Sequence, residues 1–187
     1  MNAGKRSYRM GARAEAAADT HRRIVAAIRE LAIERFLDEI TLDDVAARAG
    51  VTTRTVIRRF GGREGLVQAA FAEASAEVQA RLDETPAGDI GDAIEAVFED
   101  YERNGDALIM TLAQEGQHAE LFRPLLDEGR RSHAQWIERV FAPRDRLHAA
   151  QLIAVTDVYV WKLLRRDLGL SRARAKKAMA EMVRRLV

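Results

Sequence analysis

The stretch Thr41–Phe60, which reads TLDDVAARAGVTTRTVIRRF, constrains the fold of this chain more than any other. Its first half repeats small or apolar residues at helical spacing and stops at Gly50, a residue type that ends helices in a left-handed conformation without a Cβ clash. Thr52 is placed to cap a second helix through its hydroxyl, and Val56 and Phe60 give that helix a buried face. Two short helices joined by such a turn form a helix-turn-helix, whose second helix enters the major groove of DNA. The sequence therefore predicts a DNA-binding head.

Three arginines, Arg54, Arg58 and Arg59, lie on the second of these helices. Taken alone, they could form an ordinary solvated basic face. The turn, the cap and the apolar pattern around them favour contact with DNA, because arginine pairs with phosphates and with guanine edges.

The composition is typical of a folded, helix-rich protein: 187 residues, 48% apolar and 32% charged. The absence of cysteine excludes disulfides and thiolate metal sites. The N-terminus lacks the apolar core of a signal peptide, and the most apolar window, Leu152–Leu164, is too short and too polar to span a bilayer. No histidine or carboxylate spacing predicts a metal site, and no nucleophile arrangement predicts catalysis. We therefore expect a cytoplasmic protein that is not an enzyme, has no cofactor and does not bind membranes.

Charge is distributed unevenly along the chain. Residues 1–66 contain 13 Lys/Arg and 9 Asp/Glu, residues 67–141 contain 6 and 16, and residues 142–187 contain 11 and 4. The basic start suits binding to phosphates, whereas the acidic middle would repel DNA. We expect the basic C-terminal end to face the acidic middle, either within a subunit or across a dimer.

The pattern predicts an all-α fold with three parts: a flexible basic arm over residues 1–18, a helix-turn-helix domain over 19–66 and a helical body over 67–187. The arm carries Lys5, Arg6, Arg9 and Arg13, which either reach the minor groove or form a solubilising tail. The predicted helices are His21–Phe36, one opening at Thr41, Thr53–Phe60, one from Arg63 to about Leu82, Asp89–Arg103, Asp106–Glu115, Ala119–Phe141, Arg146–Leu168 and one from Ser171 to the end.

The head resembles the tetracycline-repressor (TetR) family. The residues that carry the resemblance are the run Ile40–Val51, then Thr55, Val56 and Phe60, then Gly62–Leu66. The resemblance implies a three-helix DNA-binding head, a helical body that binds an effector, and a dimer interface formed by the last two long helices. Ile57 departs from the family pattern, since an aromatic residue whose hydroxyl holds a phosphate is frequent there. Because Ile57 cannot donate a hydrogen bond, that contact is either missing or replaced by an apolar one, for instance with a thymine methyl group. Gly62 and Arg63 also differ from the usual cap residue and lysine.

Matched onto the family motif, the head divides into residues that reach base edges and residues that hold phosphates. The predicted base contacts are Thr53, Arg54 and Arg58. The predicted phosphate contacts are Thr41, Thr52, Thr55, Arg59 and Arg63.

The body offers candidates for an effector pocket and for a dimer interface. Aromatic and polar residues that could line a pocket, or simply belong to the core, are Phe98, Tyr101, Met110, His118, Phe122, His133, Trp136, Tyr159 and Trp161. The last two helices carry stripes that either form a four-helix bundle between subunits, which we favour, or pack inside one subunit: Ala149, Ile153, Thr156, Val160 and Leu163, with Met179, Met182 and Leu186. Six acids around one helix form a solvated face or attract a cationic ligand: Asp92, Glu95, Glu99, Asp100, Glu102 and Asp106. Asp157 interrupts an apolar stripe, so we expect it to pair with Arg or Lys.

Together these features favour a homodimeric regulator that binds double-stranded DNA at a palindromic operator and acts as a repressor released by an unknown small-molecule effector. The alternative is a DNA-binding or architectural protein that is constitutive or controlled by a protein partner, without such an effector.

Overall fold

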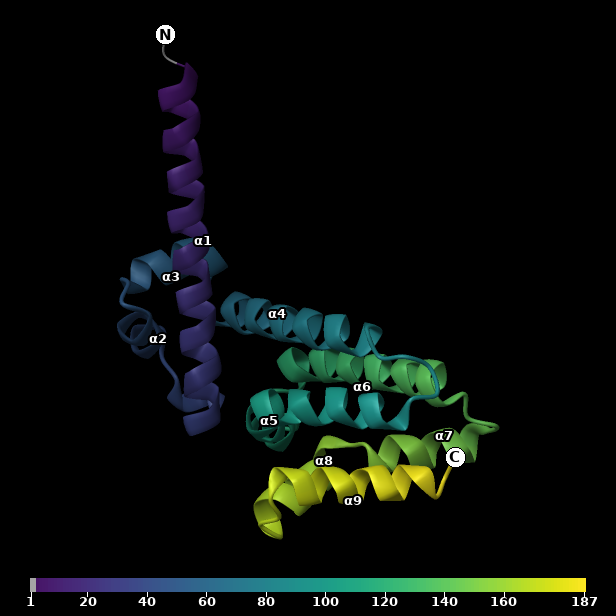
Figure 1. The fold of residues 1–187 in the computed structure, drawn as a ribbon. Helices are drawn as coiled ribbons and strands as arrows, with labels where there is room; N and C mark the ends of the chain where they lie inside the picture. The colour runs from purple at the N-terminus through teal and green to yellow at the C-terminus, as the bar shows by residue number, and fades with distance from the viewer. Residues whose placement is uncertain (1–2) are drawn as a thin grey trace. The chain divides into compact units, whose positions relative to one another are not determined.

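The computed structural model describes the backbone of residues 3–187, and all side chains in that range except those of residues 3–10 and Ala12. The described residues contain helices and no strand, so the predicted all-α class is confirmed. The chain divides into two compact units, Met1–Ala72 and Glu73–Val187, and the boundary falls within one helix, α4 (Arg63–Asp83) (Figure 1).

The N-terminal unit is built from α1 (Ala3–Glu34), a 3-10 turn (Leu37–Glu39), α2 (Leu42–Ala49), α3 (Thr53–Phe60) and the start of α4. One apolar cluster joins these helices. Its fully buried members include Ile24 and Leu31 of α1, Val45 of α2, Val56 of α3 and Leu66 of α4. The apolar residues that recur at helical spacing in the sequence therefore face the core of the head.

Helix α1 begins at Ala3, much earlier than the predicted start at His21. Residues 11–20 (GARAEAAADT) are rich in alanine and contain no proline, so nothing in them stops a helix that the head core anchors further along. The segment predicted as a flexible arm is thus drawn as helix (Figure 1), and Arg13 is exposed on it. The side chains of Lys5, Arg6 and Arg9 lie outside the described residues.

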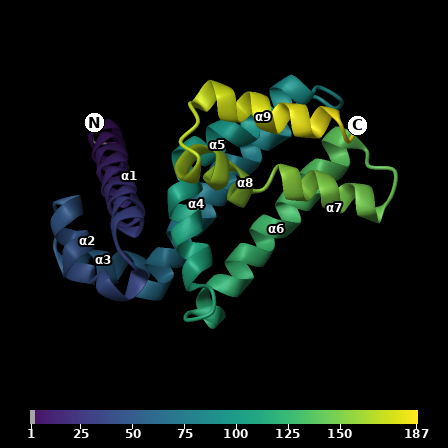
Figure 2. The ribbon, with the colours of Figure 1, turned by 90° about the horizontal axis from the view of Figure 1, so that it is seen from below.

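The C-terminal unit contains the end of α4, α5 (Ile90–Gln114), α6 (Ala119–Phe141), α7 (Arg146–Val155), α8 (Val158–Lys162), a π-helical turn (Leu163–Asp167) and α9 (Arg172–Arg184). Helix α5 contacts α6, α8 and α9, as Figures 1 and 2 show. Trp161 and Phe98 are the two largest completely buried side chains of its core. None of the described helices combines the length and apolarity needed to cross a membrane.

Helix α5 runs unbroken through Asn104-Gly105, where the sequence predicted a break between two helices. Gly105 lies under the ring of Trp161: a Cβ on Gly105 would come within 2.5–2.9 Å of three ring atoms. The glycine is therefore explained by close packing and not by a turn. A long helix that is buried along one face offsets the low helix propensity of one glycine.

The predicted single helix Arg146–Leu168 is interrupted at Thr156 and Asp157. The carboxylate of Asp157 caps α8, since its Oδ1 accepts a hydrogen bond from the backbone N–H of Tyr159 at 2.8 Å. The expected ion pair with Arg or Lys is replaced by this cap. Asp157 thus begins a new helix. The apolar stripe continues on both sides of Asp157, so the sequence pattern did not show this helix boundary.

The acidic helix α5 meets the basic C-terminal segment within one subunit. Arg165 donates from Nε and Nη2 to Glu102 at 2.5 and 2.9 Å, and Arg166 binds Asp106 through two bonds at 2.8 and 2.9 Å. Glu95 pairs with both Arg172 and Lys176. The opposite charges of the two segments therefore hold α5 to the C-terminal helices.

The surroundings of Glu102 lower the pKa of its carboxyl strongly. Hydrogen bonds from Arg165 and from the Trp161 indole, at 2.9 Å, lower its pKa from 4.5 to about 2. A carboxyl with a lowered pKa in the folded state adds stability above pH 4.5, and this stability is lost as the pH falls toward 2.

We expect Glu102→Gln to reduce the difference between the unfolding free energies at about pH 6 and about pH 3, because the unfolded-state carboxyl no longer takes up a proton over that range. Urea unfolding followed by circular dichroism measures both values. Glu128→Gln is the control for loss of an acid, since Glu128 pairs with Arg131 on an exposed surface, where an ion pair contributes little to stability. An equal pH dependence in wild type and Glu102→Gln would contradict the assignment.

Candidate nucleic-acid interface

The two helices of the predicted motif, α2 and α3, are bounded by the residues that the sequence indicated. Thr41 and Asp44 form a complete capping box at the start of α2: the Asp44 N–H donates to Thr41 Oγ1 at 3.1 Å, and the Thr41 N–H donates to Asp44 Oδ2 at 2.9 Å. Gly50 ends α2 with φ 64°, and Gly61 ends α3 with φ 77°. Thr52 caps α3 by accepting from the N–H of Thr55 at 3.3 Å. The turn is therefore fixed by local hydrogen bonds and by glycines in the left-handed region.

Two arginines, Arg23 of α1 and Arg48 of α2, hold α2 against α1. Arg23 donates from Nη1 to the carbonyl oxygen of Ala49, at the end of α2, at 2.8 Å. Arg48 pairs with Glu30 and Glu34 of α1, each at 3.1 Å, and its hydrogen bond lowers the pKa of Glu34. Sequence reasoning missed both roles. The acids Glu30 and Glu34, one helical turn apart, were the only signal for Arg48.

One face of α3 is exposed and made of Arg54, Ile57 and Arg58, at positions i, i+3 and i+4. Ile57 is 48% exposed, although the opposite side chain, Val56, is completely buried. Within the described residues, no intramolecular partner is recorded for Arg54, Arg58 or Arg59, whereas Arg23 and Arg48 are paired. The face thus presents unpaired guanidinium groups beside an apolar group, which are the chemical types that read guanine and thymine in a major groove.

The threonines predicted to touch DNA already use their hydroxyls within the chain. Thr41 donates to Asp44 Oδ2 at 2.8 Å, and the hydroxyls of Thr52 and Thr55 bond each other at 2.9 Å. Thr53 donates to Asp43, which ties the first turn of α3 to that of α2. A hydroxyl has a single hydrogen to donate. Thr41 and Thr53 would therefore have to leave a carboxylate before donating to DNA, which makes them primarily positioning residues in the free protein.

Arg63, the remaining predicted phosphate contact, lies in the first turn of α4. Its Nη2 is 3.9 Å from Asp38 Oδ1, too long for a hydrogen bond, and its Nε and Nη2 have no hydrogen-bond partner in the described part of the chain. The side chain is 36% exposed. Arg63 can therefore turn toward an anion at little cost in existing contacts.

The predicted effector-pocket residues differ in burial. Phe98, Phe122, Trp136 and Trp161 are buried. Tyr101 is also buried and donates to the Thr156 carbonyl oxygen at 3.0 Å. Met110, His118 and His133 are partly buried, and burial lowers the pKa of His133. Tyr159 is 55% exposed, so it does not line an interior pocket of a single subunit.

The residues of the predicted dimer interface also differ in how far they are buried. Thr156 and Met179 are completely buried within the subunit, because Thr156 bonds His133 at 2.9 Å and Met179 packs in the core. Their side chains cannot meet a partner, so we remove both from the interface. Leu163 is 48% exposed. The other five predicted residues are partly buried: Ala149, Ile153, Val160, Met182 and Leu186.

Comparison with known proteins identifies the head and the fold. Residues 24–70 match the family of bacterial regulatory proteins described as the tetR family. A search among curated proteins found no significant match.

Solved structures share the whole fold. A tetR-family transcriptional regulator from Streptomyces coelicolor has a TM-score of 0.71 at 19% identity, covering 90% of this chain and 80% of the other. A TerR/AcrR-family regulator from Aquifex aeolicus VF5 has a TM-score of 0.73 at 13% identity, with 90% and 99% covered. The transcriptional regulator SCO7518 from Streptomyces coelicolor A3(2) has a TM-score of 0.64 at 25% identity, with 87% and 97% covered.

The matched segment contains all of α2 and α3 with their caps, and the family's fold extends over most of the body. Residues 24–70 of the chain therefore match the DNA-binding head of the tetR family of bacterial regulatory proteins, and most of the chain shares the fold of solved regulators.

Proposed function

We propose that this regulator is a homodimeric repressor that leaves a palindromic operator when a small molecule binds its body. In a dimer, two copies of α3 would enter successive major grooves about 34–36 Å apart. Arg54 and Arg58 would contact base edges, Ile57 would contact a thymine methyl group, and Arg59 and Arg63 would hold phosphates.

The observation that carries the proposal is the exposed face of α3 with its unpaired arginines. An arginine that already forms an ion pair must lose that pair before it binds a phosphate or a base. This cost does not arise for Arg54, Arg58 and Arg59. The paired arginines Arg23 and Arg48 instead hold α2 against α1. The helix is thus prepared for an anionic surface before it meets one.

Control by a small molecule is supported by an unsatisfied donor inside the body. Trp136 is 2% exposed, and its indole Nε1–H has no hydrogen-bond partner within the described residues. A buried donor without an acceptor is costly, and an acceptor on a bound molecule would remove this cost. Such a molecule releases DNA only if it binds one body conformation better than the other. We propose that α4, which runs from the head into the body, passes this change on.

The proposed function is tested by selecting genomic DNA fragments with the purified protein at two salt concentrations. We expect one enriched palindrome that persists at the higher salt, because base contacts add to the salt-dependent phosphate contacts. Salt-sensitive binding without an enriched motif would replace this proposal with an architectural role.

The dimer is tested by Leu163→Glu, which puts a charge on an exposed apolar side chain of the proposed interface. We expect monomers by light scattering with helical circular dichroism retained, since a buried unpaired carboxylate disfavours association. Ile33→Glu is the matched control: Ile33 is 46% exposed on α1, outside the proposed interface, and the substitution should leave the dimer intact. A persistent Leu163→Glu dimer would refute this interface.

A further inference from the structure

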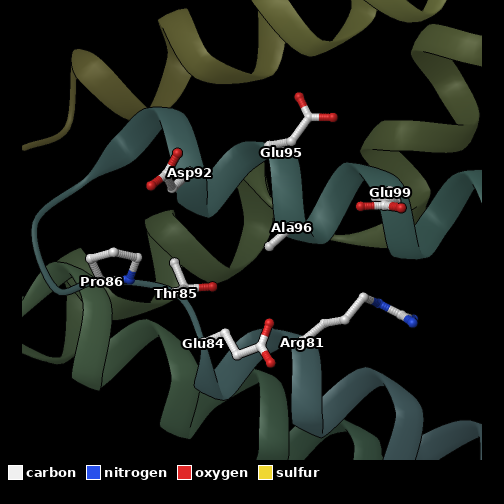
Figure 3. A pocket seen from close by; sticks show the side chains of 8 residues that line it. All are labelled: Arg81, Glu84, Thr85, Pro86, Asp92, Glu95, Ala96 and Glu99. Atoms are coloured by element: carbon white, nitrogen blue, oxygen red, sulfur yellow. The ribbon is translucent and has the colours of Figure 1, made fainter.

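An open groove of about 310 Å³ lies on the body between the end of α4 and the first turns of α5 (Figure 3). Arg81 and Glu84 line it from α4 and the residues that follow, and Asp92, Glu95 and Glu99 line it from α5. Ala96, Thr85 and Pro86 complete the lining. Four carboxylates and one guanidinium thus surround a space large enough for a small organic molecule.

The carboxylates of the groove differ in whether the protein already neutralises them. Glu95 pairs with Arg172 and Lys176, and Glu99 pairs with Arg103. The guanidinium of Arg81 pairs with Asp100 at 2.8 Å, so it does not compensate the others. For Glu84 and Asp92, no cationic partner is recorded within the described residues. They lie on opposite sides of the groove (Figure 3), so a cation between them would be attracted from both sides.

Two buried polar atoms of the lining lack a hydrogen-bond partner in the described part of the chain: Thr85 Oγ1 and Arg81 Nε. Thr85 is 5% exposed, and Figure 3 shows its hydroxyl directed toward the space between Ala96 and Arg81. A buried hydroxyl is normally satisfied, because leaving it unpaired is costly. The Thr85 hydroxyl can donate or accept, so it fits a hydroxyl group on a ligand.

Hydrogen bonds with α6 hold the backbone around Thr85 in place. Arg139 donates from Nη1 to the carbonyl oxygen of Thr85 at 2.8 Å, and from Nη2 to that of Leu82. Gly88, a few residues on, donates from its backbone N–H to the Val140 carbonyl oxygen at 2.8 Å. These contacts fix the backbone between α4 and α5, so the unpaired hydroxyl belongs to a preformed surface.

We propose that this groove binds a small organic ammonium compound that also carries a hydroxyl group. The ammonium lies between Glu84 and Asp92, and the hydroxyl group of the ligand bonds Thr85 Oγ1. The site is formed entirely within the body of one subunit and does not depend on the proposed repressor mechanism.

The test uses the full-length protein and the probe 1,3-diamino-2-propanol, with binding measured by titration calorimetry and located by amide chemical shifts. We expect saturable binding with shift changes concentrated in residues 81–99. 1,3-Diaminopropane, which lacks the hydroxyl, should bind about fivefold more weakly, as expected for one lost neutral hydrogen bond. Glycerol, which lacks the charges, should not bind measurably.

Variants of the groove separate the two halves of the site. Glu84→Gln combined with Asp92→Asn should weaken binding of the probe at least about tenfold, because the double substitution removes the attraction for the ammonium. Thr85→Val keeps the side-chain shape and should remove the preference for the hydroxylated probe. Glu120→Gln, an exposed acid of α6 outside the groove, should leave binding unchanged.

Any of three results would overturn the proposal. The first is the absence of saturable binding, and the second is binding that survives Glu84→Gln with Asp92→Asn. The third is equal affinity for the two diamines in the wild type. Thermal unfolding of each variant accompanies the titrations; if Thr85→Val does not fold, the comparison of the two diamines on wild type still tests the hydroxyl contact.

Discussion

Gly105→Ala is expected to destabilise the body by a net of about 1–2 kcal/mol. The added methyl would lie 2.5 Å from Cζ3 of Trp161, a ring that is completely buried and cannot move aside without disturbing its neighbours. Overpacking of this kind costs about 1–3 kcal/mol. The gain in helix propensity from Gly to Ala, up to about 1 kcal/mol, offsets only part of that cost.

The matched control is Gly129→Ala in α6. A Cβ on Gly129 would meet no other atom within 4 Å, so here the gain in propensity acts alone and should stabilise the protein by about 0.5–1 kcal/mol. Denaturant unfolding of both variants measures the two free energies. Because the same chemical change is expected to have opposite signs at the two sites, stabilisation by both would show that the Trp161 ring does not constrain Gly105.

Arg58→Ala and Arg59→Ala are expected to reduce DNA binding in different ways, although the two residues are adjacent and equally unpaired. If Arg58 contacts a base edge, its loss costs about 1–3 kcal/mol on the preferred site and relaxes selection at one base pair. If Arg59 holds a phosphate, its loss weakens all sequences alike and reduces the salt slope by about 1. Titration of the selected operator and of single-base variants at several salt concentrations distinguishes the two patterns.

Both substitutions introduce a good helix former at an exposed position, so α3 should remain intact in each variant. Circular dichroism and thermal unfolding provide that control. Equal losses on specific and random DNA after Arg58→Ala would remove the base-reading role from Arg58 and would leave the exposed face of α3 with phosphate contacts only.

The head was largely predictable from its sequence because its determinants are local. Thr41 with Asp44, Thr52 with Thr55, and Gly50 act within four residues of themselves, and each does in the structure what its position predicted. The apolar residues Val45 and Val56 recur at the helical period, so their burial follows from the same spacing. The resemblance to the TetR family rested on this same local pattern, and the family match covers it.

The body was predicted less well because distant residues decide what its local signals mean. Gly105 indicates a break until Trp161, far along the chain, occupies the space that its missing side chain leaves. Asp157 suggests a buried ion pair until the backbone turns there and uses the carboxylate as a cap. Composition did predict that the acidic middle attracts the basic end, but only the packing of α5 on the C-terminal helices selects which residues pair.

The sequence by itself thus determined the helix-turn-helix, its caps and the face of each head helix that is buried, since these depend on spacing along one helix. Tertiary structure alone decided which charges stay free. Arg48 and Arg58 have the same chemistry, yet Arg48 meets Glu30 and Glu34 on α1, whereas no partner is recorded for Arg58 on α3. An ion pair needs two groups within about 4 Å, and only the folded chain sets that distance.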